Sequence, residues 1–260
     1  KITLVSNRST QQNTAEAAYL GVFTPSLLQS LGRTLTAGQQ AILFQNRRGY
    51  AKQVECVSCG WMPRCPRCDV ALTYHKRFKN LQCHYCGYHM PVPNKCPQCG
   101  NDHMEEQGYG TERIEETLQR LLPVARPVRM DTDTTSSRKS YERIIDDFDS
   151  RKHNVLIGTQ MVSKGLDFSA VQTVGILNAD SLMNFPNFRS HERAFQLMEQ
   201  VAGRAGRREG QEGEVLIQCS DPKHPLLRQV VAHDYLQMAE MQLADRQRYA
   251  YPPFTRLIII

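Results

Sequence analysis

The chain has 260 residues, 40% of them hydrophobic and 22% charged, and its 32 basic and 26 acidic side chains give a net charge of +6. This composition excludes a disordered chain, and the length suits one large core with or without a small satellite domain. No apolar stretch reaches the roughly 20 residues of a membrane-spanning helix, and the start of the chain has no signal peptide, so we expect an intracellular protein with no membrane partner.

Short, nearly continuous apolar runs recur along the chain and predict strands buried on both faces of a parallel sheet. They lie at residues 2–5, 41–44, 128–130, 155–157, 173–177 and 215–217. The last residues, 257–260, are typical of a strand that is cut off in its middle, and the first residue is Lys1 rather than a methionine. We therefore interpret the chain as part of a longer protein.

Helical periodicity falls between the predicted strands. Apolar residues follow helical spacing after a predicted cap at Thr111, where Pro123 stops the pattern, and again at 141–148 and 194–201. A last helical stretch covers roughly residues 225–249. The alternation of strands and helices predicts an α/β domain with a parallel sheet.

Residues 56–99 interrupt this alternation with eight cysteines in four C-x-x-C pairs. This spacing favours metal binding over disulfides, and so small a segment needs metal to fold. The ninth cysteine, Cys219, fits a small apolar position in the last predicted strand.

Eight thiolate ligands imply two Cys₄ zinc sites, because each C-x-x-C turn supplies half of a tetrahedral site. The fourteen residues between Cys68 and Cys83 suit a zinc-ribbon hairpin, which favours a nested arrangement over a tandem one. An iron–sulfur cluster is a lesser alternative. The nested arrangement gives an outer site of Cys56, Cys59, Cys96 and Cys99 (zinc 1) and an inner site of Cys65, Cys68, Cys83 and Cys86 (zinc 2).

The role of this segment stays open at the level of sequence. Closed Cys₄ sites usually serve only to hold a fold. However, six basic residues are interleaved here with aromatic ones such as Trp61, a composition that suits stacking on single-stranded nucleic acid or docking of a protein.

Two further segments point to phosphate chemistry. Residues 200–207, QVAGRAGR, hold two arginines three residues apart between glycines, and guanidinium groups suit a phosphate ligand. Residues 155–168 form a predicted strand that ends at Thr159 and continues into a Lys-Gly-x-Asp loop. Either segment alone is compatible with an ordinary basic or polar loop.

Together, T-x(4)-K-G-x-D followed by Q-x-x-G-R-x-G-R resembles motifs V and VI of superfamily 2 helicases. With the eight-cysteine insertion after residues 44–50, the chain resembles the PriA family of primosomal replication-restart helicases over nearly its whole length. The resemblance implies a RecA-like parallel-sheet helicase lobe, related to the P-loop NTPases but without the P-loop, with an inserted two-zinc ribbon-type domain. Its implied boundaries are 1–55 and 100–224 for the second lobe, 56–99 for the insertion, 225–251 for a helical connector and 252–260 for the start of a further domain.

The same resemblance implies an ATP-dependent 3′–5′ DNA helicase in the intact protein, which binds ATP and Mg²⁺ between two lobes. The sequence itself holds no G-x(4)-G-K-[ST] phosphate loop. By resemblance, Arg207 is an arginine finger assisted by Arg204, and Gln200 senses the nucleotide. The implied nucleotide contacts are Gly165, Asp167 and Gly203, and the implied DNA contacts are Thr159, Gln160, Lys164, Arg47 and Trp61.

Expected partners are forked and single-stranded DNA, single-strand-binding protein and other primosome components, in the bacterial cytoplasm near the nucleoid. The alternative is a non-catalytic zinc-ribbon module that binds nucleic acid or primosome proteins.

Overall fold

The computed structural model describes residues 1–7, 22–46, 54–75, 79–106, 110–131, 133–163, 167–206 and 212–256. It divides into two compact units. We call the first the sheet unit (Lys1–Arg48, Tyr109–Ala179 and Gln196–Pro222) and the second the ribbon unit (Gly49–Gly108, Asp180–Phe195 and Lys223–Ile260). Each unit is described by itself.

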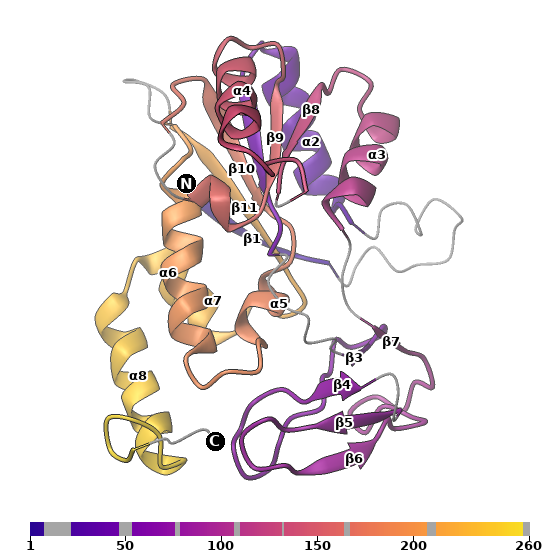
Figure 1. The fold of residues 1–260 in the computed structure, drawn as a ribbon, viewed down its shortest axis with the longest axis vertical. Helices are drawn as coiled ribbons and strands as arrows, with labels where there is room; N and C mark the ends of the chain where they lie inside the picture. The colour runs from indigo at the N-terminus through magenta and orange to yellow at the C-terminus, as the bar shows by residue number, and fades with distance from the viewer. Residues whose placement is uncertain are drawn as a thin grey trace. The chain divides into compact units, whose positions relative to one another are not determined.

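The sheet unit contains a six-stranded sheet in the order β1-β11-β10-β2-β9-β8, and all five pairings are parallel (Figure 1). The six strands predicted for the sheet are all present, so the predicted α/β fold with a parallel sheet is confirmed, whereas the strand predicted at 257–260 lies outside the described residues. The strands are β1 (Ile2–Ser6), β2 (Gln40–Phe44), β8 (Pro127–Met130), β9 (Val155–Gly158), β10 (Val171–Ile176) and β11 (Glu214–Cys219).

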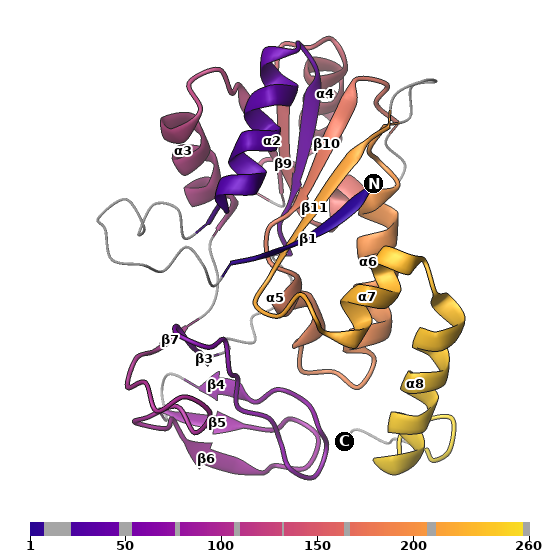
Figure 2. The ribbon, with the colours of Figure 1, turned by 180° about the vertical axis from the view of Figure 1, so that it is seen from behind.

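Helices cover both faces of this sheet. Helices α2 (Pro25–Thr36) and α3 (Thr111–Leu121) share one buried apolar cluster, to which Leu43 and Ile157 contribute from the strands. Helix α4 (Arg138–Asp149) lies on the opposite face from α2, as Figures 1 and 2 show. Successive side chains of a strand point to opposite faces of the sheet, so the continuous apolar runs of β2 and β9 make both of its faces apolar.

Helix α2 was not predicted, although its sequence carries clear helix signals. Thr24 caps it by accepting a hydrogen bond from the Leu27 backbone N–H, and Pro25 occupies the first turn. Leu27, Leu31 and Leu35 recur every four residues and are buried.

Two details of the predicted helices are wrong. The N-cap of α3 is Gly110 rather than Thr111, whose hydroxyl donates instead to the Asp131 carboxylate. The stretch at 225–249 forms two helices, α7 (Pro225–Ala232) and α8 (Tyr235–Arg248). They separate because His233 adopts a left-handed conformation with φ of 55° and Asp234 caps α8 by accepting from the Gln237 N–H.

The ribbon unit is built from very short strands. β3 (Val54–Cys56) pairs antiparallel with β7 (Met104–Glu106), and β4 (Thr73–His75), β5 (Asn80–Gln82) and β6 (His89–Pro91) form a second antiparallel sheet. The β4–β5 hairpin lies between Cys68 and Cys83, where the spacing predicted it. Helix α5 (Ala179–Met183) ends in this unit, and α6 (Ser190–Ala202) begins in it. Among the described residues, no helix is long and apolar enough to cross a membrane.

We predict that Gly158→Ala destabilises the sheet unit by about 1–3 kcal/mol, the usual cost of overpacking a core. A methyl group there would overlap Cγ1 of Val162, a fully buried side chain that is stiff about its first torsion angle. Gly110→Ala is the matched control, because a methyl group at Gly110 meets nothing within 4 Å. Urea unfolding measures both, and equal stability of the two variants would contradict the packing described here.

We predict that His191 weakens the ribbon unit at acidic pH. Burial, and secondarily His224 at a ring distance of 5.6 Å, lowers the pKa of His191 to about 4. The unfolded chain takes up this proton near pH 6.5, so the contribution of His191 to the free energy of unfolding is fully present above that pH. It declines as the pH falls toward 4, by about 3 kcal/mol in all.

The variant His191→Gln keeps a polar partner for Gln242 but cannot titrate. Thermal unfolding at pH 7 and pH 5 should therefore show a smaller loss of stability for the variant than for the parent chain. An identical loss in both would show that His191 contributes nothing to the pH dependence.

Candidate metal centres and nucleotide and DNA contacts

The four C-x-x-C segments fold into four copies of one backbone turn, which we call a knuckle. In each, the residue after the second cysteine has positive φ and donates its N–H to the carbonyl of the first cysteine. The N–H of the first cysteine donates in turn to the carbonyl two residues beyond the second. The residues with positive φ are Gly60 (70°), Asp69 (48°), Gly87 (70°) and Gly100 (76°).

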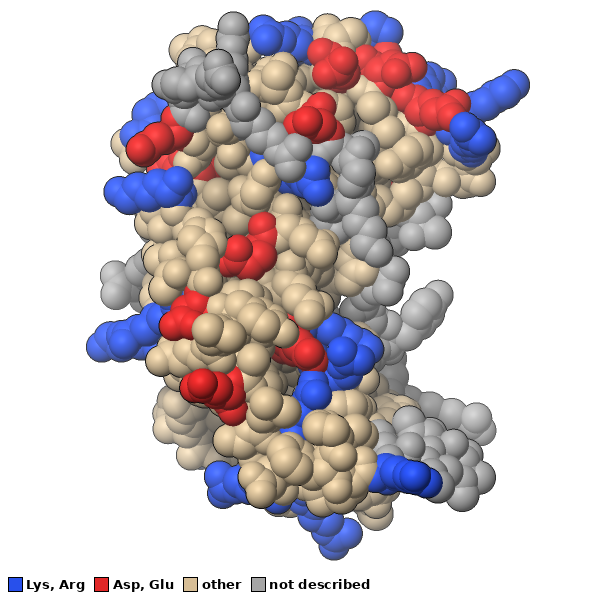
Figure 3. Space-filling model, turned by 90° about the vertical axis from the view of Figure 1, so that its left-hand side faces the viewer, with Lys and Arg blue, Asp and Glu red and all other residues tan. Residues whose placement is uncertain are grey.

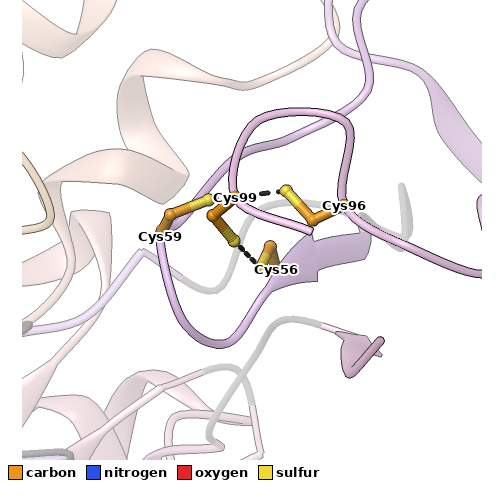
Figure 4. A group of neighbouring side chains, drawn as sticks. All are labelled: Cys56, Cys59, Cys96 and Cys99. Atoms are coloured by element: carbon orange, nitrogen blue, oxygen red, sulfur yellow. Dashed lines mark hydrogen bonds between the residues drawn. The ribbon is translucent and has the colours of Figure 1, made fainter. Parts of the chain in front are cut away.

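The knuckles meet in pairs to form two cysteine tetrads, the same two that the nested arrangement predicts. Within each tetrad all Sγ atoms lie within 4.8 Å of one another. In the outer tetrad, Cys56 lies 3.6 Å from Cys99 and Cys59 lies 3.5 Å from Cys96 (Figure 4). Four sulfurs bound to one zinc at ~2.3 Å are about 3.8 Å apart, so the outer tetrad fits a tetrahedral ion. In the inner tetrad, Cys65 and Cys86 are likewise 3.6 Å apart.

The acid–base properties of the thiols also fit a cation. Burial raises the pKa of Cys59 to about 12. Burial opposes ionisation of Cys96 as well, but hydrogen bonds from the Cys99 and Gln98 backbone outweigh it and lower its pKa to about 7. The two thiols share the outer tetrad, which therefore does not lose all its protons at neutral pH unless a cation neutralises the thiolates. Two Zn²⁺ ions, one in each tetrad, supply that charge.

Trp61, a predicted DNA contact, belongs to the outer knuckle. Its carbonyl accepts the Cys56 N–H, and its side chain is partly buried. The fold of the outer zinc site thus fixes the backbone of Trp61.

The arginine-containing turn lies at the amino end of β10. Helix α6 ends at Ala202, and the turn that follows returns to the sheet through a hydrogen bond of 2.9 Å from the Gly206 N–H to the Val171 carbonyl. A side chain at Gly213 would overlap the backbone of Ala205 and Gly206, so only glycine fits at position 213. Gly203 and Gln200 are exposed and Arg204 is half-buried. Asp167, also exposed, precedes Val171 by four residues, so two of the predicted nucleotide contacts, Asp167 and Gly203, lie in the segments next to the amino end of β10.

Thr159 and Gln160 lie at the opposite end of the sheet, beyond the carboxyl end of β9. The Thr159 N–H is 3.4 Å from the Met130 carbonyl, and Thr159 is largely buried, whereas Gln160 is partly exposed. Gln45, which follows β2, donates its N–H to the Gly158 carbonyl at 3.0 Å. Open parallel sheets commonly bind ligands at these carboxyl ends. Four other predicted site residues, Arg47, Lys164, Gly165 and Arg207, lie outside the described residues.

One polar cluster at this carboxyl edge was not among the predicted site residues. The Asp131 side chain, fully buried after β8, accepts hydrogen bonds from the Thr111 hydroxyl and from the backbone of Asp133 and Thr134. Burial alone raises the pKa of Asp131, but these donors outweigh it and lower the pKa below its ordinary value. Asp131 thereby ties the first turn of α3 to the turn after β8. Thr111 and Asp131 are twenty positions apart in the sequence, so only the folded sheet brings them together.

Family models match both parts of the chain. The helicase conserved C-terminal domain matches residues 109–209, and the Cys-rich region domain of the PriA DNA helicase matches residues 65–91. These matches define a helicase C-terminal lobe with a cysteine-rich insertion.

Curated relatives narrow this class further. The chain is 44% identical over 239 residues to replication restart protein PriA of Bacillus subtilis, covering 92% of this chain and 30% of that protein. It is 40% identical over 243 residues to the same protein of Synechocystis, covering 92% of this chain and 29% of that protein. The chain belongs to the PriA family, and it spans about a third of the length of these relatives.

We predict that Cys96→Ser lowers the zinc content from two ions per chain to one. The substitution removes a thiolate from the outer tetrad and leaves the inner tetrad complete. Cys219→Ser is the matched control and should retain two, because Cys219 is buried in β11 and belongs to neither tetrad. Elemental analysis of purified protein gives both values, and two zinc ions in Cys96→Ser would contradict the assignment of the ligands.

Proposed function

We propose that this chain is the second lobe of an ATP-dependent 3′–5′ DNA helicase that recognises stalled or repaired replication forks and initiates primosome assembly. The observation that carries the proposal is that β9 and β10 follow one another in the chain and run parallel in the sheet. Residues 159–163 follow the carboxyl end of β9, where proposed DNA contacts lie, and residues 167–170 precede the amino end of β10, where the arginine turn lies. One short piece of chain therefore joins the two sites that a helicase must couple.

Each end of the segment has a proposed role. Thr159, Gln160 and Lys164 contact the DNA backbone. Gly165, Asp167 and Gly203 contact ATP and its Mg²⁺, which the intact protein binds between its two lobes. Gln200 senses the nucleotide, and Arg207, assisted by Arg204, stabilises charge on the γ-phosphate as an arginine finger.

DNA binding in this proposal depends on local contacts rather than on one broad basic surface. On the face shown in Figure 3, basic and acidic side chains are interspersed over most of the surface. The proposed contacts are those of the 159–164 segment, together with Arg47 and the partly exposed Trp61. Forked and single-stranded DNA, single-strand-binding protein and other primosome components are the proposed partners, at the nucleoid of a bacterial cell.

We also propose the domain boundaries given above. The insertion at 56–99 carries both tetrads, and residues 225–251 follow the lobe as a helical segment.

We predict that Arg207→Ala in the intact protein lowers ATP turnover on the order of 10³-fold and abolishes unwinding of a forked duplex. Nucleotide binding should change little, because the finger acts mainly on the transferring phosphate. Arg228→Ala, which removes an exposed arginine of α7, is the control and should behave as the parent protein.

The chain of residues 1–260 should show no ATP hydrolysis of its own, because its sequence holds no phosphate loop. Unchanged turnover in Arg207→Ala, or hydrolysis by this chain alone, would contradict the proposed roles. A non-catalytic zinc-ribbon module would be the better description if the intact protein neither hydrolyses ATP nor unwinds DNA.

A further inference from the structure

The two tetrads are not equivalent in what they contact, because the inner knuckles pack against residues far away in the sequence. Within the ribbon unit, the Tyr251 hydroxyl donates to the carbonyl of Cys68, a zinc ligand, at 2.7 Å. Tyr251 follows α8 and is buried. A residue beyond the last helix thus binds directly to the backbone of the inner metal site.

An aromatic cluster extends this contact. The Phe188 ring stacks on Tyr251 with centroids 4.9 Å apart and an interplanar angle of 14°. Tyr85, which lies between the ligands Cys83 and Cys86, meets Tyr251 edge-on at 5.8 Å and Phe188 at 6.5 Å. The guanidinium of Arg246 lies over the Phe188 ring at 5.3 Å and pairs with Glu192 of α6. Both inner knuckles therefore touch a cluster built from α6, α8 and the turns beside them.

The knuckle at 65–70 has a further anchor, because it is the one knuckle of the four whose left-handed position is held by a residue other than glycine. Asp69 has φ of 48° there, a conformation that costs an aspartate more than a glycine. Its carboxylate accepts from Nε of Arg64 at 3.0 Å, and Nη1 of Arg64 donates to Asn184 at 3.1 Å. Through Arg64, the aspartate thus links the knuckle to Asn184 in the turn after α5.

Little space remains between these groups. The cavity lined by Arg64, Asp69, Arg246 and Tyr251 has a volume of about 30 Å³, room for a water molecule or two and not for a ligand. The contacts are those of packed structure rather than of an open binding site.

We propose that the inner zinc site is a docking element, whose metal binding is linked thermodynamically to the packing of Phe188 and Tyr251. Zinc fixes the backbone of Cys68 and the position of Tyr85, and these two groups are what Tyr251 and Phe188 contact. Because linkage is reciprocal, docking of the aromatic residues stabilises the inner zinc, and the inner zinc stabilises their docking. The outer zinc has none of these contacts and is independent of them.

The first test measures how fast each zinc leaves the zinc-loaded full chain in excess chelator, using a chromogenic zinc indicator. Tyr251→Phe removes only the hydroxyl that binds Cys68 and should speed loss of one zinc about fivefold, the effect of one hydrogen bond. Phe188→Ala should speed it more than tenfold. Tyr235→Phe, the same chemical change in the exposed first turn of α8, is the control and should release both ions at the parent rate.

Alkylation of the freed thiols, mapped by mass spectrometry, identifies which zinc has left. The proposal requires early labelling of Cys65, Cys68, Cys83 and Cys86 and unchanged labelling of the outer four. Equal acceleration at both tetrads, or no acceleration in either variant, would overturn it.

The reciprocal test follows hydrogen exchange in residues 184–192 and 249–251 after removal of one zinc. Cys83→Ser, which disables the inner tetrad, should increase exchange there at least tenfold, whereas Cys96→Ser, which disables the outer tetrad, should leave it unchanged. The same exchange in both variants would show that docking does not depend on the inner metal.

Discussion

Strand β2 pairs in parallel on both sides, with β9 and with β10, and the rest of the sheet unit depends on this double pairing. It fixes which residues meet at each end of the sheet. The carboxyl ends of β2, β8 and β9 bring together Gln45, Asp131 and Thr159, and the amino end of β10 receives the arginine turn. Because β9 and β10 both run parallel to β2, the chain between them must return from the carboxyl end of the sheet to its amino end.

The ribbon unit obeys a different constraint. Its apolar cluster is small, and two of its members, Cys65 and Cys83, are themselves metal ligands. Metal coordination therefore supplies stability that a larger domain draws from apolar burial. The four knuckles satisfy their own backbone hydrogen bonds locally, so each needs only its cysteines and one residue that tolerates positive φ.

The sequence predicts those parts of the structure that local patterns determine. Continuous apolar runs identify all six strands of the sheet, and C-x-x-C spacing identifies both tetrads, because each signal lies within a few residues. Contacts between distant residues leave no such pattern. Nothing near Thr111 shows that its hydroxyl binds Asp131 rather than capping a helix, and nothing near Tyr251 indicates Cys68 as its partner. The break at His233 was missed for another reason, since helical periodicity continues across it and only the left-handed conformation interrupts the helix.

The pairing of β3 with β7 has an evolutionary consequence. These strands open and close the cysteine-rich segment, so residues 54 and 106 are register partners although more than fifty positions separate them. A module whose two ends meet can be gained, lost, lengthened or exchanged between lineages as a single event, without changing the spacing of the flanking chain. Changes within the module are therefore confined to it, and the sheet that carries it stays intact.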